Sequence, residues 1–286
     1  MADGNGEPEG VGRTAIGVAF VRAGESRRPD ALFHDPYAWR FVEAQSWRPP
    51  ESLPDAADVR RRFWTTVIEG TVVRTRFLDE YAEAATRAGC GQVVILGAGL
   101  DARAYRLDWP AGVRLFEVDT ADVLGFKDRV LDGEPARCAR VPVATDLRDD
   151  WPAALTAAGF RADEPTAWIA EGLLIYLSDA ENDVLMERLG ALSAPGSRLG
   201  LTLSGRKDGD PVVPRAGAPA DGDPGSPTVT VVGMWRSDGP ADPETWLAGH
   251  GWDATVYRTG ERAEAYGRPM TAETHRPRHL VDAVRR

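Results

Sequence analysis

Cysteine and lysine are scarce in this chain of 286 residues. Cys90 and Cys138 are the only cysteines, too few for a disulfide framework, and they form no Cys-x-x-Cys pair for zinc or redox chemistry. Lys127 and Lys207 are the only lysines, so arginine carries nearly all of the positive charge. The sequence also contains no P-loop and no Gly-x-Ser-x-Gly elbow. These absences argue against a disulfide-stapled domain, a P-loop nucleotidase and a serine hydrolase.

An excess of positive charge and long apolar segments are lacking as well. The formal net charge of −10 argues against nonspecific binding to nucleic acids. No apolar run approaches the roughly 20 residues that a membrane-spanning helix needs. Residues 1–12 are polar and glycine-rich, without the apolar centre of a signal peptide. We therefore expect a cytoplasmic protein with a disordered tail over residues 1–12, and neither nucleic acid nor a membrane as partner.

An apolar segment that ends in two glycines organises the chain. Residues 92–96 read Gln-Val-Val-Ile-Leu and are followed by Gly97 and Gly99. This pattern is typical of a central parallel strand that leads into a helix beside a nucleotide. Glycine has no Cβ, so the turn can be sharp and the backbone can lie close to a ligand. Residues 113–119 then predict a second strand ending in Asp119, an acid suited to bind ribose hydroxyls.

These residues alone leave other interpretations open. The spacing Gly97-x-Gly99-x-x-Ala102 also fits a dinucleotide-binding protein. A tight turn between strand and helix without any ligand would contain the same glycines. Asp119 could equally cap the helix that follows it.

The first third of the sequence predicts helices only. Apolar spacing indicates a short helix over residues 14–23 and a second one that starts at Asp35. A long helix is indicated over residues 55–87, in which Gly70 could be a break. Because these helices precede the first strand, we expect residues 13–88 to pack outside the sheet as an N-terminal helical cover.

Strands and helices alternate from residue 89 onward. Further strands are predicted over residues 140–144, 167–170, 197–203, 253–258 and 279–284. Helices fit between them, for example over residues 179–192. This alternation predicts an α/β fold with a doubly wound, mostly parallel, Rossmann-like sheet over residues 89–286. Residues 205–228 are rich in proline and glycine, so we expect a mobile loop there.

Short motifs in separate parts of the chain, spread over residues 14–270, point to one family. They are Arg22-Ala23-x-Glu25, Leu32-Phe33-x-Asp35-Pro36-x-Ala38, Arg74-Thr75-Arg76-Phe77-x-Asp79, Leu96-Gly97-Ala98-Gly99-x-Asp101, Phe116-Glu117-Val118-Asp119, Glu171-Gly172-x-x-x-Tyr176-Leu177 and Trp246-Leu247-x-x-x-Gly251-Trp252. Together they resemble the leucine carboxyl methyltransferase-like family of S-adenosylmethionine-dependent methyltransferases. The resemblance is strongest to its bacterial branch, which includes polyketide carboxyl methyltransferases.

The resemblance implies that S-adenosylmethionine is the cofactor and assigns residues to it. Gly97 and Gly99 would approach its amino acid part, and Asp119 would accept hydrogen bonds from its ribose hydroxyls. Asp146 and Leu147 would flank the adenine, with Asp146 accepting from the adenine amino group. Without that role, Asp146 is an ordinary turn residue at the end of a strand.

Two further charged residues complete the cofactor site that the resemblance implies. Glu171 follows the strand over residues 167–170 and would face the ammonium group of the cofactor. An acid in that position needs a cationic partner if it is buried. Arg74 would bind the cofactor's carboxylate, a task that suits a planar guanidinium. Arg76 cannot share a helix face with Arg74, and a solvent-exposed Arg74 remains the alternative.

The histidines offer neither a convincing metal site nor a convincing base. His275 and His279 have the spacing of helical metal ligands, but Pro277 between them argues against a helix. His34 and His250 are expected at the surface. We therefore expect no metal and identify no catalytic residue.

Methyl transfer to a carboxylate needs no base, because a carboxylic acid with a pKa near 4 is ionised at neutral pH. The resemblance implies a small-molecule carboxylate as the acceptor, and the residues are compatible with it, since one of Arg13, Arg22, Arg27 and Arg28 could orient a carboxylate. A phenol or hydroxyl acceptor, an NAD-dependent oxidoreductase and a non-catalytic cofactor-binding protein are the alternatives. The sequence identifies neither the acceptor nor the oligomeric state.

Overall fold

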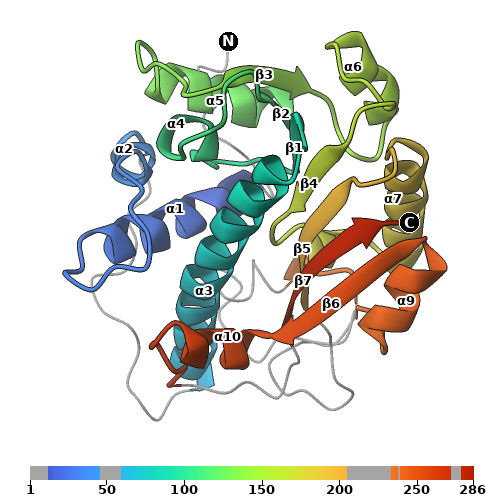
Figure 1. Cartoon of the computed structure of the whole chain (residues 1–286). Helices are drawn as coiled ribbons and strands as arrows, with labels where there is room; N and C mark the ends of the chain where they lie inside the picture. The colour runs from blue at the N-terminus through green and yellow to red at the C-terminus, as the bar shows by residue number, and fades with distance from the viewer. Residues whose placement is uncertain (1–11, 46–58, 205–232, 238, 272–277) are drawn as a thin grey trace.

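The computed structural model of the protein describes residues 12–45, 59–204, 233–237, 239–271 and 278–286 (Figure 1). The tail predicted over residues 1–12, apart from Gly12, and the loop predicted over residues 205–228 lie outside the described residues. No helix in these ranges is long and apolar enough to cross a membrane. The predicted cytoplasmic location stays a prediction.

A single mixed sheet runs through the molecule in the strand order β3-β2-β1-β4-β5-β7-β6. Neighbouring strands from β3 through β5 pair in parallel, while β7 lies antiparallel between β5 and β6. Strand order reverses direction between β1 and β4, as in other doubly wound sheets. The predicted fold class is thereby confirmed. The strands are β1 (Gln92–Leu96), β2 (Arg114–Asp119), β3 (Ala139–Ala144), β4 (Thr166–Ala170), β5 (Arg198–Ser204), β6 (Trp252–Arg258) and β7 (Arg278–Arg285).

Both faces of the central strands are covered, which explains why these strands are apolar throughout. Every residue of β1 and of β4 is buried. Strands buried on both faces read as continuous hydrophobic runs without alternation. Pro142 lies in β3, which is an edge strand, where a residue without a backbone N–H is tolerated.

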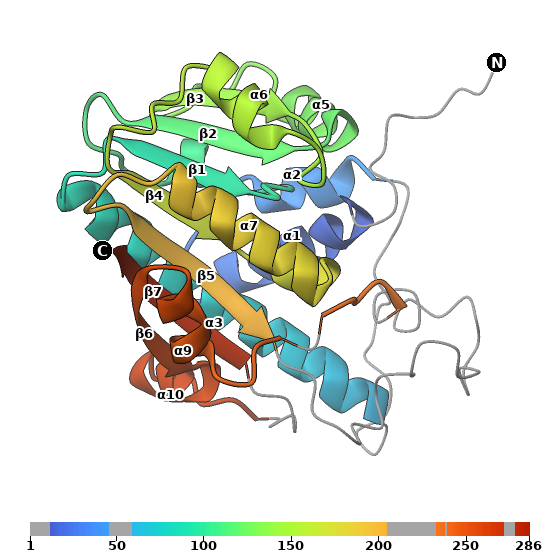
Figure 2. The same ribbon diagram turned by 90° about the vertical axis from the view of Figure 1, so that its right-hand side faces the viewer.

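Helices form a layer on each face of the sheet (Figures 1 and 2). Val93 and Ile95 of β1 pack into one hydrophobic core, whereas Val94 and Leu96 pack into the other, as the alternation of a strand requires. The first core includes residues of α1 (Gly12–Ser26), α2 (Ala38–Glu43), α3 (Val59–Arg87), α4 (Arg103–Arg106), α5 (Ala121–Val130) and α10 (Thr259–Ala265). The second includes residues of α6 (Trp151–Ala157), α7 (Asp179–Ala191) and α9 (Pro243–Gly249).

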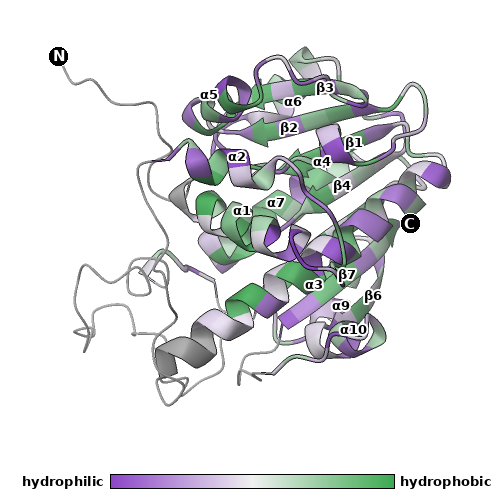
Figure 3. Ribbon diagram, turned by 90° about the vertical axis from the view of Figure 1, so that its left-hand side faces the viewer, coloured by the Kyte–Doolittle hydropathy of each residue, from purple (hydrophilic) through white to green (hydrophobic). Residues whose placement is uncertain are grey.

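The N-terminal helices lie outside the sheet, as expected for a cover. Hydrophobic and hydrophilic residues alternate along α3, so that one of its faces meets the sheet (Figure 3). Phe77 of α3 and Ile16 of α1 share the first core with β1. The division at residue 88 into a cover and an α/β domain stays a prediction.

Helix α3 continues through Gly70, so the break considered there is wrong. A Cβ on Gly70 would lie 2.8 Å from Nη1 of Arg278 in β7. This nitrogen donates to the backbone oxygen of Thr66, at 3.0 Å. The glycine therefore leaves room for an arginine against the helix and does not interrupt it.

Gly200 in β5 gives a test of this packing. A Cβ there would lie 2.5 Å from Cδ1 of Tyr81, a buried ring whose hydroxyl donates to Trp168 O at 3.0 Å. The ring cannot withdraw without losing that bond, so we expect Gly200→Ala to lower the free energy of unfolding by about 1–3 kcal/mol, as overpacking does. Urea denaturation measures the loss.

Gly249→Ala is the matched control, because no atom lies within 4 Å of a Cβ at Gly249. This change should be neutral or stabilise the protein by at most about 1 kcal/mol. Equal free energies of unfolding for the two variants would contradict the packing described for Tyr81.

Candidate active site

The predicted site residues follow strands whose carboxyl ends lie side by side. Residue pairing aligns Leu96 of β1 with Val118 of β2, and Ile95 with Ile169 of β4. Gly97, Asp119 and Glu171 therefore follow one edge of the sheet, at the point where strand order reverses. Ligands of open α/β sheets bind in the crevice at this place.

The glycine turn after β1 needs glycine for its conformation. The backbone angle φ is +59° at Gly97 and +50° at Gly99, in the left-handed region that side chains disfavour. A Cβ on Gly97 would lie 3.0 Å from Cδ1 of Leu173, and one on Gly99 would lie 3.2 Å from Cβ of Ala15. Helix α1, which carries Ala15, thus packs directly against the turn.

Asp119 binds the glycine turn through its carboxylate. The backbone N–H groups of Gly99 and Thr120 donate to its two oxygens, each at 2.7 Å. Burial raises the pKa of Asp119, against the lowering effect of these hydrogen bonds. Among the described residues no lysine or arginine pairs with it. A half-buried carboxylate without a cation is well suited to accept further hydrogen bonds from two hydroxyl groups.

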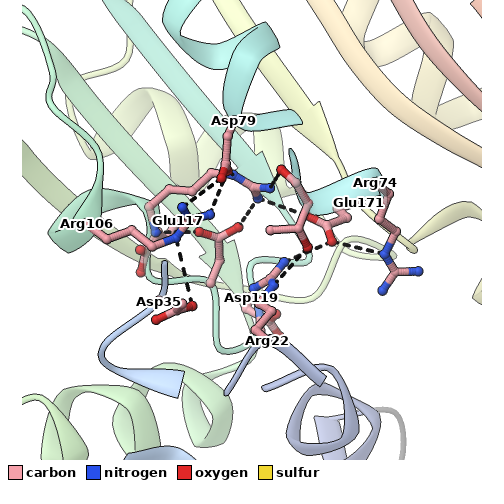
Figure 4. Close-up of polar contacts among 12 residues, drawn as sticks. Arg22, Asp35, Arg74, Asp79, Arg106, Glu117, Asp119 and Glu171 are labelled. Atoms are coloured by element: carbon pink, nitrogen blue, oxygen red, sulfur yellow. Dashed lines mark hydrogen bonds and ion pairs between the residues drawn. The ribbon is translucent and has the colours of Figure 1, made fainter. Parts of the chain in front are cut away.

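Three arginines surround the carboxylate of Glu171 (Figure 4). Oε1 accepts from Arg22 Nη2 at 2.9 Å and from Arg74 Nε at 3.0 Å. Oε2 accepts from Arg103 Nη1 at 2.9 Å. Burial alone would raise the pKa of Glu171, but the charges of Arg22, Arg103 and Arg74 outweigh it and hold the pKa far below its usual value. Its predicted contact with the cofactor's ammonium stays a prediction.

Arg103 connects most of these charges, and sequence reasoning missed it. Its side chain is wholly buried. Nε donates to Asp79 at 2.8 Å, Nη1 donates to Asp101 and Glu171, and Nη2 donates to Thr75 O at 3.3 Å. Burial would lower the pKa of Arg103, but the surrounding acids raise it well above its usual value. The signal available in the sequence was a pair of charges, Asp101 and Arg103, inside an otherwise apolar stretch.

Further ion pairs extend from Arg103 and Glu171 to other residues, and the resulting cluster contains as many acids as arginines. Arg106 donates to Asp79 at 2.6 and 2.7 Å, and its Nε lies 3.9 Å from Asp35 Oδ2. Arg22 also donates from Nε to Thr75 Oγ1 at 3.2 Å. We call the whole set the acid–arginine cluster: Arg22, Arg74, Arg103, Arg106, Asp35, Asp79, Asp101 and Glu171.

Arg74 keeps both of its terminal nitrogens available. Its Nε binds Glu171, whereas the described part of the chain contains no partner for Nη1 or Nη2. These atoms lie within 3.4 Å of the position that a Cβ would occupy on Gly172, where φ is +64°. Arg76 lies on another face of α3 and pairs with Glu80 at 2.9 Å. Arg74 is therefore the arginine that α3 directs to the site.

Asp146 and Leu147 follow β3 and lie beside Asp119. The backbone N–H of Thr145, the residue before Asp146, donates to Asp119 O at 2.9 Å and holds the start of this segment beside β2. Asp146 accepts from the backbone N–H and the guanidinium of Arg148, each at 2.9 Å, and these bonds lower its pKa. Leu147 packs half-buried against the second core. Their predicted contacts with adenine stay predictions.

The described histidines lie outside the acid–arginine cluster. His34 is exposed, with Nδ1 3.3 Å from Ser26 O. His250 follows α9 and lies 3.4 Å from Asp183. His279 is in β7, and His275 lies outside the described residues. No group of three or more potential metal ligands occurs in the described ranges.

Comparison with known proteins identifies the family. Residues 15–190 match the leucine carboxyl methyltransferase family. A protein of Streptomyces avermitilis is 51% identical over 98% of this chain and 97% of its own length, and one of Streptomyces coelicolor is 52% identical over the same shares. The chain belongs to the leucine carboxyl methyltransferase family. The predicted family is thus confirmed, and so is the enzyme class, a methyltransferase. The names of both relatives provisionally class them as S-adenosyl-L-methionine-dependent methyltransferases and give no acceptor.

Solved structures agree with the family at the level of fold. A DUF574 family protein of Streptomyces avermitilis has a TM-score of 0.56 at 13% identity and covers 94% of this chain and 97% of its own. A protein of Thermobifida fusca, titled provisionally as a methyltransferase, has a TM-score of 0.50 at 17% identity and covers 94% of both chains.

The site fits the cofactor that the sequence predicts. The turn at Gly97 and Gly99 admits close approach of a ligand, and Asp119 has acceptor capacity left for ribose hydroxyls. Arg74 has two terminal nitrogens that match a carboxylate. These contacts would match the carboxylate and the ribose hydroxyls of the cofactor.

Substitution of Asp119 tests the ribose contact. We expect Asp119→Asn to weaken binding of S-adenosylhomocysteine by about 1.5–3 kcal/mol, the range for hydrogen bonds to a charged group. Isothermal titration calorimetry gives the affinity. Asp132→Asn, an exposed acid beyond the end of α5, is the control and should bind like the unchanged protein. Equal affinity of Asp119→Asn and the control would rule out the ribose assignment.

The same contact should make binding depend on pH. Ribose hydroxyls donate to the charged carboxylate, and burial raises the pKa of that carboxylate in the free protein above its usual 3.8. The affinity for S-adenosylhomocysteine should therefore have its full value at pH values above this raised pKa and decline as the pH falls through it. In Asp119→Asn the decline should disappear, whereas an unchanged decline would assign it to another group.

Proposed function

We propose that this protein transfers the methyl group of S-adenosyl-L-methionine to the carboxylate of a small molecule and so forms a methyl ester. Its enzyme class and cofactor follow from the family and from relatives that share half of its sequence over nearly their whole length. The chain is an S-adenosyl-L-methionine-dependent methyltransferase. The carboxylate acceptor and the ester product are the proposal.

The family match is the observation that carries this proposal. It spans residues 15–190, which contain all of the predicted cofactor residues and the whole acid–arginine cluster. The family is described by methyl transfer to a carboxyl group. A protein that shares this site with the family is expected to share its type of acceptor, although the acceptors of the two relatives are not named.

The chemistry of a carboxylate suits the residues present. The cofactor supplies a methyl group that is already activated on a sulfonium. An acceptor oxygen forms the new O–C bond while the C–S bond breaks, and the carboxylate has no proton to lose. The protein then has to align the two reactants and exclude water, and it needs no general base.

The positions of the histidines support the same conclusion. A phenol, with a pKa near 10, would usually need a base within hydrogen-bond reach of its hydroxyl. His34 is exposed and His250 pairs with Asp183 beside α9. Neither belongs to the acid–arginine cluster, so the described residues favour an acceptor that is ionised before it binds.

One of the cover arginines lies in the site. Arg22 belongs to the acid–arginine cluster, whereas Arg27 stacks on Trp39 at 4.1 Å and Arg28 pairs with Asp30 at the surface. The side chain of Arg13 is outside the described residues. Of these three described arginines, Arg22 is thus the one beside the site, with Nε and Nη2 already bound to Thr75 and Glu171.

The nature of the product distinguishes the proposal from its alternatives. The protein would be incubated with S-adenosylmethionine labelled in the methyl group and a panel of small carboxylic acids and phenols. We expect label in a product that releases it as methanol in mild alkali, because esters hydrolyse there and phenol ethers do not. The rate should also be flat around neutral pH, since the acceptor is ionised throughout.

Asp119→Asn serves as the control that the label passes through this site, and it should transfer little label at low cofactor concentration. Label that survives alkali would establish a hydroxyl acceptor in place of the carboxylate. Cofactor binding without transfer to any acid or phenol would favour the non-catalytic alternative. Binding of NAD in place of S-adenosylhomocysteine would support the alternative that the protein is an oxidoreductase.

A further inference from the structure

Arg103 lies beneath the site and not in it. Its side chain has no exposed surface, so it cannot touch a ligand bound at the edge of the sheet. Its guanidinium nevertheless contacts three acids from different parts of the chain: Asp79 of α3, Asp101 after the glycine turn, and Glu171 after β4. These segments also carry Arg74, Gly97 and Gly99, the residues assigned to the amino acid end of the cofactor.

The two carboxylate oxygens of Glu171 accept hydrogen bonds from different arginines. Oε2 accepts from Arg103, whereas Oε1 accepts from Arg22 and from Nε of Arg74. Arg74 binds Glu171 through one nitrogen, on the side of Oε1, while the guanidinium of Arg103 lies at Oε2. An arginine facing both oxygens of a free carboxylate would instead form two parallel hydrogen bonds, which is the stronger arrangement.

We propose that Arg103 is a positioning residue for cofactor binding. It occupies Oε2 of Glu171 and so keeps both terminal nitrogens of Arg74 available for the carboxylate of the cofactor. Without Arg103, Glu171 would draw one terminal nitrogen of Arg74 to Oε2. Arg74 would then no longer offer its pair of terminal donors to the ligand. The adenosine end, which Asp119 is expected to bind, would not be affected.

This inference rests on the proposed function only through the cofactor and holds for any methyl acceptor. Failure of the unchanged protein to bind S-adenosylhomocysteine would overturn the proposed function itself. If only the inference is wrong, the unchanged protein still binds S-adenosylhomocysteine, and the variants described below do not show the expected change in affinity.

Arg106 provides a matched control. It lies one helical turn after Arg103, is likewise buried, and binds the same Asp79 at 2.6 and 2.7 Å. No hydrogen bond or ion pair within the described ranges joins it to Glu171 or Asp101. Arg106→Lys therefore disturbs a buried ion pair of the same kind without releasing Oε2.

The test compares two ligands by calorimetry. S-adenosylhomocysteine carries the amino acid end, whereas 5′-methylthioadenosine keeps the adenine, ribose and thioether and lacks that end. We expect Arg103→Lys to weaken binding of S-adenosylhomocysteine by about tenfold to a hundredfold, the size of a hydrogen bond to a charged group. Its affinity for 5′-methylthioadenosine should be unchanged, and Arg106→Lys should preserve the ratio of the two affinities.

If Arg103 had a purely structural role, its replacement would lower the affinities for both ligands by the same factor. An equal loss for both in Arg103→Lys, or the same ratio change in Arg106→Lys, would overturn the proposal. Asp101→Asn covers the case that Arg103→Lys does not fold, because Asp101 binds the same Nη1 that donates to Glu171. This variant should show the selective loss to a smaller degree, and an unchanged ratio in it would also overturn the proposal.

Discussion

A buried carboxylate keeps its charge only where cations or hydrogen-bond donors replace the water around it, and this constraint shapes the centre of the molecule. The side chains of Glu171, Asp101 and Asp79 are each at most 7% exposed, and Arg103 binds each of them from a side chain with no exposed surface. Buried ion pairs add little net stability, because desolvation offsets much of the attraction. Their effect here is geometric: α3, the glycine turn and the end of β4 cannot shift independently without separating charges.

The rest of the site consists of the few polar groups that this arrangement leaves incompletely paired. Within the described ranges, Asp119 has hydrogen bonds from Gly99 and Thr120 and no cation, and Arg74 binds Glu171 through Nε alone. One group is an acceptor and the other a donor, and both lie at the edge where strand order reverses. A ligand with hydroxyl groups at one end and a carboxylate at the other complements both, as S-adenosylmethionine does.

Much of the fold can be predicted from the sequence because β1 and β4 are buried on both faces and therefore read as apolar runs. The short helix α10 was not predicted, since so few residues give no periodic signal. The sequence left a break at Gly70 open because the neighbour that explains this glycine, Arg278, comes from the far end of the chain. Arg103 escaped prediction for the same reason: its partners Asp79 and Glu171 are 24 and 68 residues away. Sequence motifs identified Asp119 and Arg74, but only the packed chain shows which of their atoms are available.

The central claim is that the cofactor lies between Asp119 and Arg74, supported from below by the acid–arginine cluster. A crystal structure of the complex with S-adenosylhomocysteine tests it most directly. The account predicts both ribose hydroxyls at Asp119 and the amino acid carboxylate at Nη1 and Nη2 of Arg74, each within about 3.2 Å, with Arg103 still bound to Oε2 of Glu171. A ligand whose carboxylate lies away from Arg74, or whose ribose contacts a residue other than Asp119, would contradict it.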